Sequence, residues 1–523
     1  MIGVQIGAGL VGHADFDELF RDWLHGQQDL GSATADLKSF FATDEASTSP
    51  GAIWNDSDWR DSWMNELLPD LPDDAARDRA RQAVDRLAAG EADVVITGQQ
   101  PGFLGGPLYT LYKVVTTVVL AEMRTAAGRP TIPIFWSGDD DDDIREALLP
   151  VAWDPGREVL FHHEHHGGRE LSNDMMVGDL PSQDIARGGA DWLEEIADSN
   201  ALARDLAGIW RDGVDGQRPW GRIQRRALLR IFASSGLLIV RGNDASMHAA
   251  ASPFYDQLWQ RRDELRDAAR RGGGQLTAAG YATAVGDPSI QRFLHLGENG
   301  RRRPLSAEHA GSLPEARLLR PGVVARSPVQ DWLFRPAGVV VGPGEVAYLK
   351  QLEPVYAAFD IPRAPLLPRL FAQLGPEGHG AFTAWAMDLA ERDQGDDDEA
   401  PREAASKVAA AARGELLSVL REQMGDQSQR IDVLADQVLK RWEKHLDSVL
   451  KREEKRRRAD TGAGQPDWVR PEGRRQERSL AAFCALALWG DELVAAMAHA
   501  CRRHVDAGLD NDWREYLLTV PTP

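Results

Sequence analysis

The stretch from Val94 to Glu146 constrains the fold of this chain more than any other feature. Two runs of β-branched and aromatic residues, Val94 to Thr97 and Thr131 to Trp136, each end in a loop, and one long helical pattern joins them. This order predicts a strand–loop–helix–strand–loop unit of an open α/β sheet. Ligands bind at the carboxyl ends of strands in such sheets, so we predict that the chain binds a small molecule.

Length and charge narrow the class of protein. A chain of 523 residues is too long for one compact core, so we expect two or three units. The net charge of −21 opposes nonspecific binding to nucleic acid, which relies on cationic contacts with phosphates. We therefore expect no nucleic-acid partner.

Cysteine content and the N-terminal sequence indicate a cytoplasmic protein. The two cysteines, Cys484 and Cys501, fit neither a CxxC motif nor a disulfide framework, which favours a reducing compartment. The first residues lack a basic leader, so we expect no signal peptide. We find no apolar run of the roughly 18 to 20 residues that cross a bilayer, so we expect no membrane partner.

A second strand–loop–helix unit is predicted farther along the chain. Gly236 to Val240 is typical of a buried strand, a helix is expected from about Asp244 to Arg270, and Gly272 to Gly274 indicate a flexible break. The second unit follows this break. Its two short strands are expected at Val323 to Ser327 and at Gly338 to Val341. Its turn is Gly342-Pro343-Gly344, and its helix is expected at Glu345 to Phe359.

Changes in composition divide the chain into four predicted segments. Residues 1–90 are expected to be mostly helical and to include a capped helix from Asp73 to Ala89. Residues 91–389 form the α/β core, with insertions at about 160–235 and 270–320. Residues 390–462 form a helical arm, and residues 463–523 return to the core as a helical segment, with an amphipathic helix from Gln476 to His504.

One apolar stripe runs along the predicted arm. From Ile431 onward its spacings of three and four residues are typical of a coiled coil. A helix this long cannot bury such a stripe against itself, so a second helix or a second subunit is expected. The stripe consists of Leu416, Val419, Ile431, Leu434, Val438, Trp442, Leu446 and Val449.

The loop after the first strand has the composition of a binding loop. Its glycines let backbone amides approach a ligand, and the helix that follows favours anions at its N-terminus. The alternative is a tight structural turn with buried glutamine side chains. The candidate binding residues here are Thr97, Gly98, Gln99, Gln100, Gly102, Gly106, Tyr109 and Lys113.

Five consecutive carboxylates, Asp139 to Asp143, follow the strand that ends at Trp136. Like charges this close raise one another's pKa unless a cation compensates. That cation would be Mg²⁺, which prefers oxygen ligands, or a substrate ammonium. Asp140, Asp141 and Asp143 are the candidate catalytic residues, and Trp136 is a candidate binding residue. A solvated acidic loop is the alternative.

The second unit supplies a further set of candidate binding residues around its Gly-Pro-Gly turn. Glu345 lies in a first helical turn, where a carboxylate also stabilises the helix dipole without any catalytic role. Tyr348 is also compatible with an ordinary core position. The candidates are Arg326, Gln330, Asp331, Gly342, Gly344, Glu345, Tyr348 and Gln351.

The histidine-rich loop HHEHH, His162 to His166, does not have the spacing of a zinc site. It differs from HExxH because the second histidine would fall on Gly167. We therefore predict no metal ligands here. Both cysteines are expected to lie in the core, and the run KREEKRRR, Lys451 to Arg458, at the solvated end of the arm.

These segments together resemble the bacillithiol biosynthesis BshC family of cysteine-adding ligases. The family shows the ordered segments TGQQxG…GPLYT, PVFW…EDHD, RPxxQDxLxPxxAYVxGPxEIAYxxQL and PxGxxQER. The corresponding segments of this chain are Thr97 to Thr110, Pro133 to Asp143, Arg326 to Leu352 and Pro471 to Arg478. The resemblance covers roughly residues 90–505.

The resemblance implies a fold, an activity and partners. The fold would be a Rossmann-like core of the nucleotidyltransferase type with inserted connecting segments, and a coiled coil would pair two subunits into a homodimer. The reaction would add L-cysteine to glucosaminyl-malate, which completes bacillithiol. Amide formation needs an activated acyl group, so we expect ATP to be consumed to ADP, with Mg²⁺ as a possible companion.

Residue roles follow from this expectation. The TGQQ loop would shape the floor of a cleft facing the GPGE turn, and Lys113 would meet a phosphate or a carboxylate. Asp140, Asp141 and Asp143 would hold an ammonium or a metal-bound phosphate. Asp142 stands where the family has histidine, which removes a group that changes charge near neutral pH. This leaves two alternatives open: a related ligase with another amino acid or sugar partner, and a non-catalytic coiled-coil homologue.

Overall fold

The computed structural model describes most of the chain outside the predicted arm. The described residues are 2–9, 16–24, 26, 37–42, 51–163, 171–172, 174–305, 313–376, 467, 469, 471 and 474–521. One compact unit comprises Met1–Met387 and Asp467–Pro523, and the second comprises Asp388–Pro466. The predicted arm at 390–462, its apolar stripe and the run from Lys451 to Arg458 lie outside the described residues.

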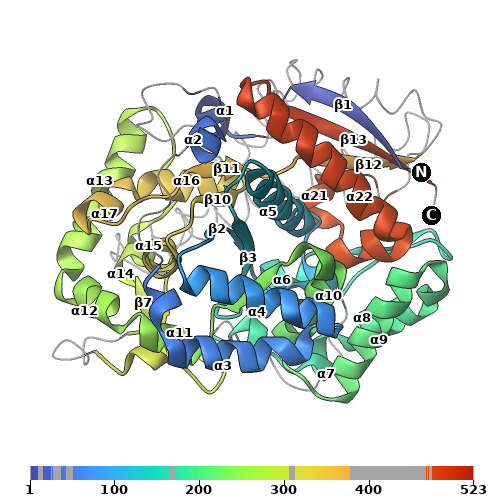
Figure 1. Ribbon diagram of the computed structural model, residues 1–523, viewed down its shortest axis with the longest axis horizontal. Helices are drawn as coiled ribbons and strands as arrows, with labels where there is room; N and C mark the ends of the chain where they lie inside the picture. The colour runs from blue at the N-terminus through green and yellow to red at the C-terminus, as the bar shows by residue number, and fades with distance from the viewer. Residues whose placement is uncertain are drawn as a thin grey trace, which may run out of the picture. The chain divides into compact units, whose positions relative to one another are not determined.

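Among the described residues, five strands form a central parallel sheet (Figure 1). Their apolar runs suit strands that are covered on both faces. The order is β11 (Leu366–Pro368), β10 (Gly338–Val341), β2 (Asp93–Gln99), β3 (Thr131–Ser137) and β6 (Leu238–Arg241). The strands predicted from Val94, Thr131, Gly236 and Gly338 are thereby confirmed, as is the α/β class.

The helix between the first two predicted strands is α5, Tyr109–Ala126. It packs on β2 and β3 and also against α22, Ala482–Leu509, and Figure 1 shows the two helices lying over the same side of the sheet. In the described part of the chain, α22 alone is long and apolar enough to cross a membrane by composition, and 61% of that window is buried inside the fold. Such burial is typical of a core helix. Cys484 and Cys501 lie on α22, and both are buried free thiols, as predicted.

The two ends of the described chain form strands rather than helices. β1 (Gly3–Gly9) pairs antiparallel with β13 (Arg514–Val520), and β12 (Ala372–Pro376) pairs parallel with β13 on its other side. The sequence predicted a mostly helical segment at 1–90 and a helical segment at 463–523, and it did not predict the strands β1 and β13. The helix predicted from Asp73 is confirmed as α4, Asp74–Ala88, because the Asp73 side chain caps it by accepting from the Ala76 amide at 2.7 Å.

Two further predictions are corrected by tertiary contacts. The segment predicted as a strand from Val323 forms the start of helix α15, Val323–Phe334. The predicted break at Gly272 to Gly274 lies inside helix α13, Arg262–Ala278. A Cβ atom on Gly272 would lie 1.8 Å from the backbone oxygen of Gln351, so Gly272 allows close packing of α13 on the segment that contains Gln351.

The insertion predicted at 270–320 carries structure of its own. It holds helix α14 (Asp287–Gln291) and three strands in the order β8-β7-β9. These strands are β7 (Leu294–Glu298), β8 (Arg301–Pro304) and β9 (Leu319–Pro321). The helix predicted from Asp244 divides into α11 (Ala245–Ala250), α12 (Ser252–Gln260) and α13.

Breaks also divide two other predicted helices. The helix predicted from Glu345 consists of α16 (Pro343–Gln351) and α17 (Glu353–Ala358), and the one predicted from Gln476 consists of α21 (Gln476–Ser479) and α22. The remaining elements used below are α3 (Ser57–Leu67), α6 (Ile144–Leu148), β4 (Ala152–Asp154), α8 (Arg187–Glu195), α9 (Ala201–Asp215) and α10 (Trp220–Ile231).

Candidate functional site

A cavity of about 490 Å³ lies where the carboxyl ends of β2, β3 and β10 meet helices α15 and α16. The two glycine-bearing turns, far apart in the sequence, both line it, as the sheet topology predicts. The predicted residues that line the cavity are Gly98, Gln99, Gln100, Tyr109, Lys113, Trp136, Asp141, Arg326, Gln330, Asp331, Gly342, Gly344, Glu345 and Tyr348.

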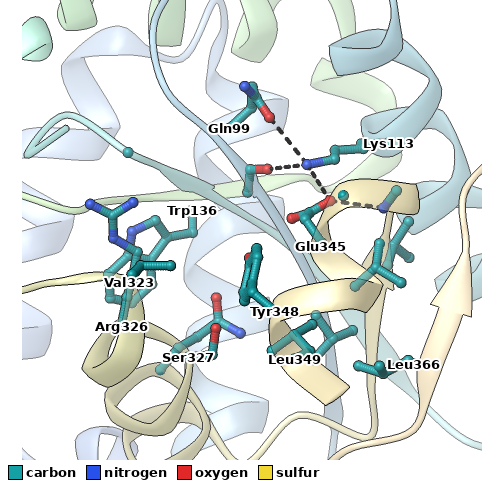
Figure 2. Close-up of a pocket in the computed structure, with 18 of the residues that line it drawn as sticks. Gln99, Lys113, Trp136, Val323, Arg326, Ser327, Glu345, Tyr348, Leu349 and Leu366 are labelled. Carbon is teal, nitrogen blue, oxygen red and sulfur yellow. Dashed lines mark hydrogen bonds and ion pairs between the residues drawn. The ribbon is translucent and has the colours of Figure 1, made fainter. Parts of the chain in front are cut away.

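Lys113 lines this cavity, and Figure 2 shows its ammonium pointing toward Gln99 and Glu345. The ammonium donates to the Gly98 carbonyl at 2.9 Å and to Gln99 Oε1 at 3.1 Å, and it pairs with Glu345 Oε2 at 2.6 Å. An ammonium has three donors, and protein oxygens accept all of them here. Lys113 therefore has no spare donor for a phosphate in this arrangement.

Glu345 closes the N-terminus of α16 with its own side chain. Its Oε2 accepts from the Gly342 amide at 2.8 Å, in addition to pairing with Lys113. A helix N-terminus is an anion site, and here the chain's own carboxylate already occupies it. The described cavity residues thus do not fit the triphosphate of a nucleotide, and we place no step of the reaction on one.

Arginines lie next to the aspartate run and compensate part of its charge. Arg326 pairs with Asp141 at 2.9 Å and with Asp140 at 3.3 Å. Burial alone would raise the pKa of Asp141, but Arg326 and Arg302 outweigh it and hold that pKa below its ordinary value. Among the described residues, no group of three or more His, Cys, Asp or Glu side chains is arranged to hold a metal ion.

The other members of the run have structural partners. Asp139 is buried and pairs with Arg225 of α10 at 2.6 Å. Asp142 lies 3.5 Å from Arg302. Burial is the main cause of its raised pKa, and the charge of Arg302 opposes it. Asp143 caps α6 by accepting from the Glu146 amide at 2.9 Å.

The catalytic assignment of Asp140 and Asp143 is corrected by this arrangement. Neither residue lines the cavity, since Asp140 is fully buried behind Arg326 and Asp143 caps a helix. Of the three predicted carboxylates, only Asp141 reaches the cavity. The solvated-loop alternative also fails, because Asp139 and Asp140 are buried.

Asp331 is a cavity carboxylate with neutral hydrogen-bond partners. It accepts from the Tyr356 hydroxyl at 2.9 Å and from the Gln330 amide at 3.2 Å. Burial raises its pKa to about 6, against smaller opposing effects of these two bonds and of Arg363. This side chain can therefore gain or lose a proton close to neutral pH.

The phenols of Tyr109 and Tyr348 face the cavity as neutral groups. Burial is the main cause that raises the pKa of each, and the nearby charge of Glu146 or Glu345 adds to it. Tyr109 donates its hydroxyl to Glu146 Oε1 at 3.4 Å and accepts from the Gln99 amide at 3.2 Å. Both phenols remain hydrogen-bond donors across the physiological pH range.

Two predicted binding residues serve the fold instead. The Thr97 hydroxyl donates to the Val340 carbonyl at 2.9 Å and ties β2 to β10. The Gln351 amide accepts from the backbone N–H groups of Ala284 and Val285 and donates to the Val285 carbonyl. Neither side chain lines the cavity. For these residues the structural alternative is the correct one.

The second half of the TGQQ loop also has a structural role. The Gly102 amide donates to the Gln224 side chain at 2.9 Å, and the Gly106 carbonyl accepts from the Ala482 amide at 2.8 Å. Gly105 lies between them at φ +90°, and a Cβ atom there would meet the Phe483 ring at 2.8 Å. Gly102 and Gly106 therefore dock the loop on α10 and α22 and lie outside the cavity lining.

Several cavity residues lie outside the predicted set. They are charged or polar side chains from segments distant in sequence, including Glu146, Arg363, Arg369 and Arg478. The motif segment Pro471 to Arg478 ends at this residue and is the sequence signal that points to Arg478. Of the HHEHH loop, His162 and His163 are described and neither lines the cavity, while residues 164–166 lie outside the described residues.

Comparison with known families decides the assignment. The family model described as "Bacillithiol biosynthesis BshC, N-terminal Rossmann-like domain" matches residues 19–313 and 308–370, which is more than half of the chain. The chain belongs to the BshC family. The match spans the five strands of the central sheet and the first three motif segments.

Individual BshC relatives are similar at moderate identity. Proteins named "Putative cysteine ligase BshC" are 29% identical over 318 residues in Geobacillus thermodenitrificans, 26% over 322 residues in Shouchella clausii and 29% over 345 residues in Halalkalibacterium halodurans. The matched part is 56%, 57% and 61% of this chain. It spans 57%, 58% and 62% of those relatives, so this chain matches less than two thirds of their length.

Proposed function

We propose that this BshC-family chain is a cytoplasmic ligase that joins the carboxyl group of L-cysteine to the amine of glucosaminyl-malate and thereby completes bacillithiol. The family match and the relatives' name, cysteine ligase, support this proposal. The observation that carries it is one cavity at the carboxyl ends of the strands that Gln99, Asp141 and Glu345 all line.

The cavity supplies groups that amide formation needs. The attacking amine must lose a proton, and a general base works best when its pKa lies near the working pH. Asp331 meets that condition and lines the cavity, so we assign it the proton-accepting role. The phenol of Tyr348 is a neutral donor for an oxygen atom of the carboxyl group, whereas Tyr109 already donates its hydroxyl to Glu146.

We also propose that a nucleotide supplies the energy, because condensation of a carboxylate with an ammonium in water needs an activated acyl group. ATP with Mg²⁺ is the expected source. The cavity residues described above do not fit its phosphates, so Asp331 and Tyr348 act on the amine and the acyl group alone.

The alternative of a different amino acid or sugar partner loses its main support. It was motivated by Asp142, and Asp142 pairs with Arg302 outside the cavity lining. The non-catalytic alternative is disfavoured because charged groups converge in the cavity rather than apolar replacements.

A product assay tests the proposal. Purified full-length protein with glucosaminyl-malate, ATP, Mg²⁺ and either cysteine or serine should form the cysteine amide alone, detected by mass spectrometry. Equal amounts of serine amide would favour the related ligase. No product, together with no calorimetric signal for cysteine or glucosaminyl-malate, would favour the non-catalytic homologue and end the proposal.

A further inference from the structure

We propose that Arg478 is the residue that binds a carboxylate of the substrate in this cavity, and that the carboxylate belongs to the hydroxydicarboxylate part of the sugar acceptor. This inference rests on the proposed function, because that function supplies an acceptor with two carboxylates. Arg478 lines the cavity and lies on α21, a short helix near the C-terminal end of the chain.

The other cations of the cavity already have carboxylate partners. Lys113 pairs with Glu345 at 2.6 Å, and Arg326 pairs with Asp141 at 2.9 Å. The remaining two arginines of the lining, Arg363 and Arg369, pair with Glu353 at 2.5 Å and with Glu477 at 2.8 Å. A substrate carboxylate that met any of these four cations would compete with a protein carboxylate.

Arg478 differs from them. Within the described residues its side chain has neither a hydrogen bond nor an ion pair, and it is exposed at the edge of the cavity. Its charge nevertheless acts on the site, because it opposes the burial that raises the pKa of Tyr109 and, with Arg369 and Arg475, helps to hold the pKa of Glu477 below its ordinary value. Among the described cavity residues, Arg478 is therefore the cation that an incoming anion can meet without displacing a protein carboxylate.

The backbone around Arg478 is fixed on both sides. Gln476 accepts from the Leu374 amide at 2.8 Å and donates to the Leu374 carbonyl at 3.1 Å. Glu477 forms its ion pair with Arg369 with both side chains 3% exposed. Such anchoring reduces the entropy lost when the guanidinium engages a ligand.

The following residues complete this anchor. The Ser479 carbonyl accepts from the Val151 amide at 2.8 Å, and the Leu480 carbonyl accepts from the Leu108 amide at 2.8 Å, directly before α5. An exposed arginine is more often only solvated. Here four of its neighbours in sequence are bound to the fold, one of them to the cavity residue Arg369 and one to Leu108 directly before α5, which favours a ligand-binding role.

The charge balance selects a carboxylate over a polyphosphate. A guanidinium binds one carboxylate through two parallel hydrogen bonds. A triphosphate needs several cations or a free helix N-terminus, whereas the other cavity cations are paired and Glu345 fills the N-terminus of α16. One open guanidinium therefore matches one carboxylate group.

The kinetic test compares two acceptors in full-length protein. R478Q should lower kcat/KM for glucosaminyl-malate by roughly 10- to 100-fold, mainly through KM, because a charge-assisted bond is lost. It should change kcat/KM for methyl glucosaminide, which has no carboxylate, by less than about threefold, and R478K should recover part of the loss. The control is R204Q, an exposed arginine of α9 that does not line the cavity and should behave as the wild type.

Each other outcome overturns the inference. Equal losses for both acceptors would assign Arg478 a structural role, and a raised KM for cysteine would assign it to the cysteine carboxylate. A further arm is independent of turnover: calorimetry should detect malate binding to the wild type and to R204Q, and at least 10-fold weaker binding to R478Q. If inorganic phosphate displaced malate at equal concentration, the site would be a general anion site. Failure of every turnover assay would reject the proposed function, and the malate arm would still decide this inference.

Discussion

At the residue scale, Lys113 and Glu345 neutralise each other's charge in the cavity. The Lys113 side chain is 4% exposed and the Glu345 side chain 24% exposed, so their ion pair is largely shielded from water. Breaking one partner of such a pair leaves a desolvated charge unmatched. The same logic holds for Arg326 with Asp140 and Asp141, and it explains how a run of carboxylates folds next to a cavity.

Lys113→Met should lower the free energy of unfolding by about 1–3 kcal/mol, because Glu345 loses its cation and the Gly98 carbonyl loses a donor. Glu345→Gln should cost less, since the amide still accepts from Gly342. Urea unfolding of both variants and of the double variant measures the coupling between the two side chains. Lys38→Met, at an exposed position, is the control. Strictly additive losses would show that the pair does not stabilise the fold.

Asp331 should make stability fall between about pH 4 and pH 6. Its pKa rises from 3.8 to about 6 on folding, so in this window the folded form holds a proton that the unfolded form has lost. The free energy of unfolding is therefore highest at pH values below the pKa of Asp331 in the unfolded chain. It decreases as the pH rises through this window, by roughly 2–3 kcal/mol in total. Urea unfolding of the wild type and of Asp331→Asn at several pH values measures the difference. A difference that stays constant across this window would contradict the assignment.

At the element scale, the TGQQ loop divides into two parts. Its first part, Gly98 to Gln100, lines the cavity, and its second part, Gly102 to Gly106, docks on α10 and α22. The backbone that presents Gln99 is therefore held by helices that belong to other parts of the sequence. Docking of this kind requires glycine where the Phe483 ring approaches the backbone.

Gly105→Ala should destabilise the protein more than Gly128→Ala. Both glycines have φ close to +90°, so both substitutions carry the same backbone strain. The new Cβ at position 105 meets the Phe483 ring at 2.8 Å, whereas the one at position 128 meets nothing within 4 Å. The expected difference in unfolding free energy is about 1–3 kcal/mol, measured by urea denaturation. Equal losses would show that the loop does not pack on α22 as described.

At the scale of the whole molecule, local patterns predicted the sheet well. The segments from Val94, Thr131 and Gly338 are short β-branched runs bounded by loops, and all three form strands in the structure. The segment from Val323 carries a similar β-branched start but folds as a helix, because tertiary packing overrides a weak local preference. Gly272 to Gly274 failed as a break for the same reason.

The candidate site was predictable where it depends on strand ends. Gln99, Asp141 and Glu345 follow predicted strands, and topology places such residues at one edge of the sheet. Arg369 and Arg478 were missed because their relation to the cavity depends on the Arg369–Glu477 pair, which joins residues far apart in sequence. The pairing of the aspartate run with Arg225, Arg302 and Arg326 was also not predicted, since composition does not show which charges meet.

The homodimer remains a prediction at this scale, because residues 390–462 lie outside the described residues. Light scattering of the full chain at micromolar concentration should give the mass of two subunits. Leu434→Asp, placed in the apolar stripe, should shift the mass toward one subunit, since a charge at a coiled-coil seam opposes pairing. Gln437→Asp, which is outside the stripe, should keep the dimer. A monomeric wild type would contradict the prediction.

The most direct test of the central claim is turnover of Asp141→Asn in the cysteine amide assay by mass spectrometry. Asp141 lines the cavity and Asp143, two residues later, caps α6 outside it. We predict that Asp141→Asn lowers kcat/KM by about 100-fold or more, whereas thermal stability falls only moderately because Arg326 keeps its ion pair with Asp140. Asp143→Asn should stay near the wild type, because asparagine also caps helices. Wild-type turnover in Asp141→Asn, or equal losses in both variants, would contradict the account that amide formation occurs in this cavity.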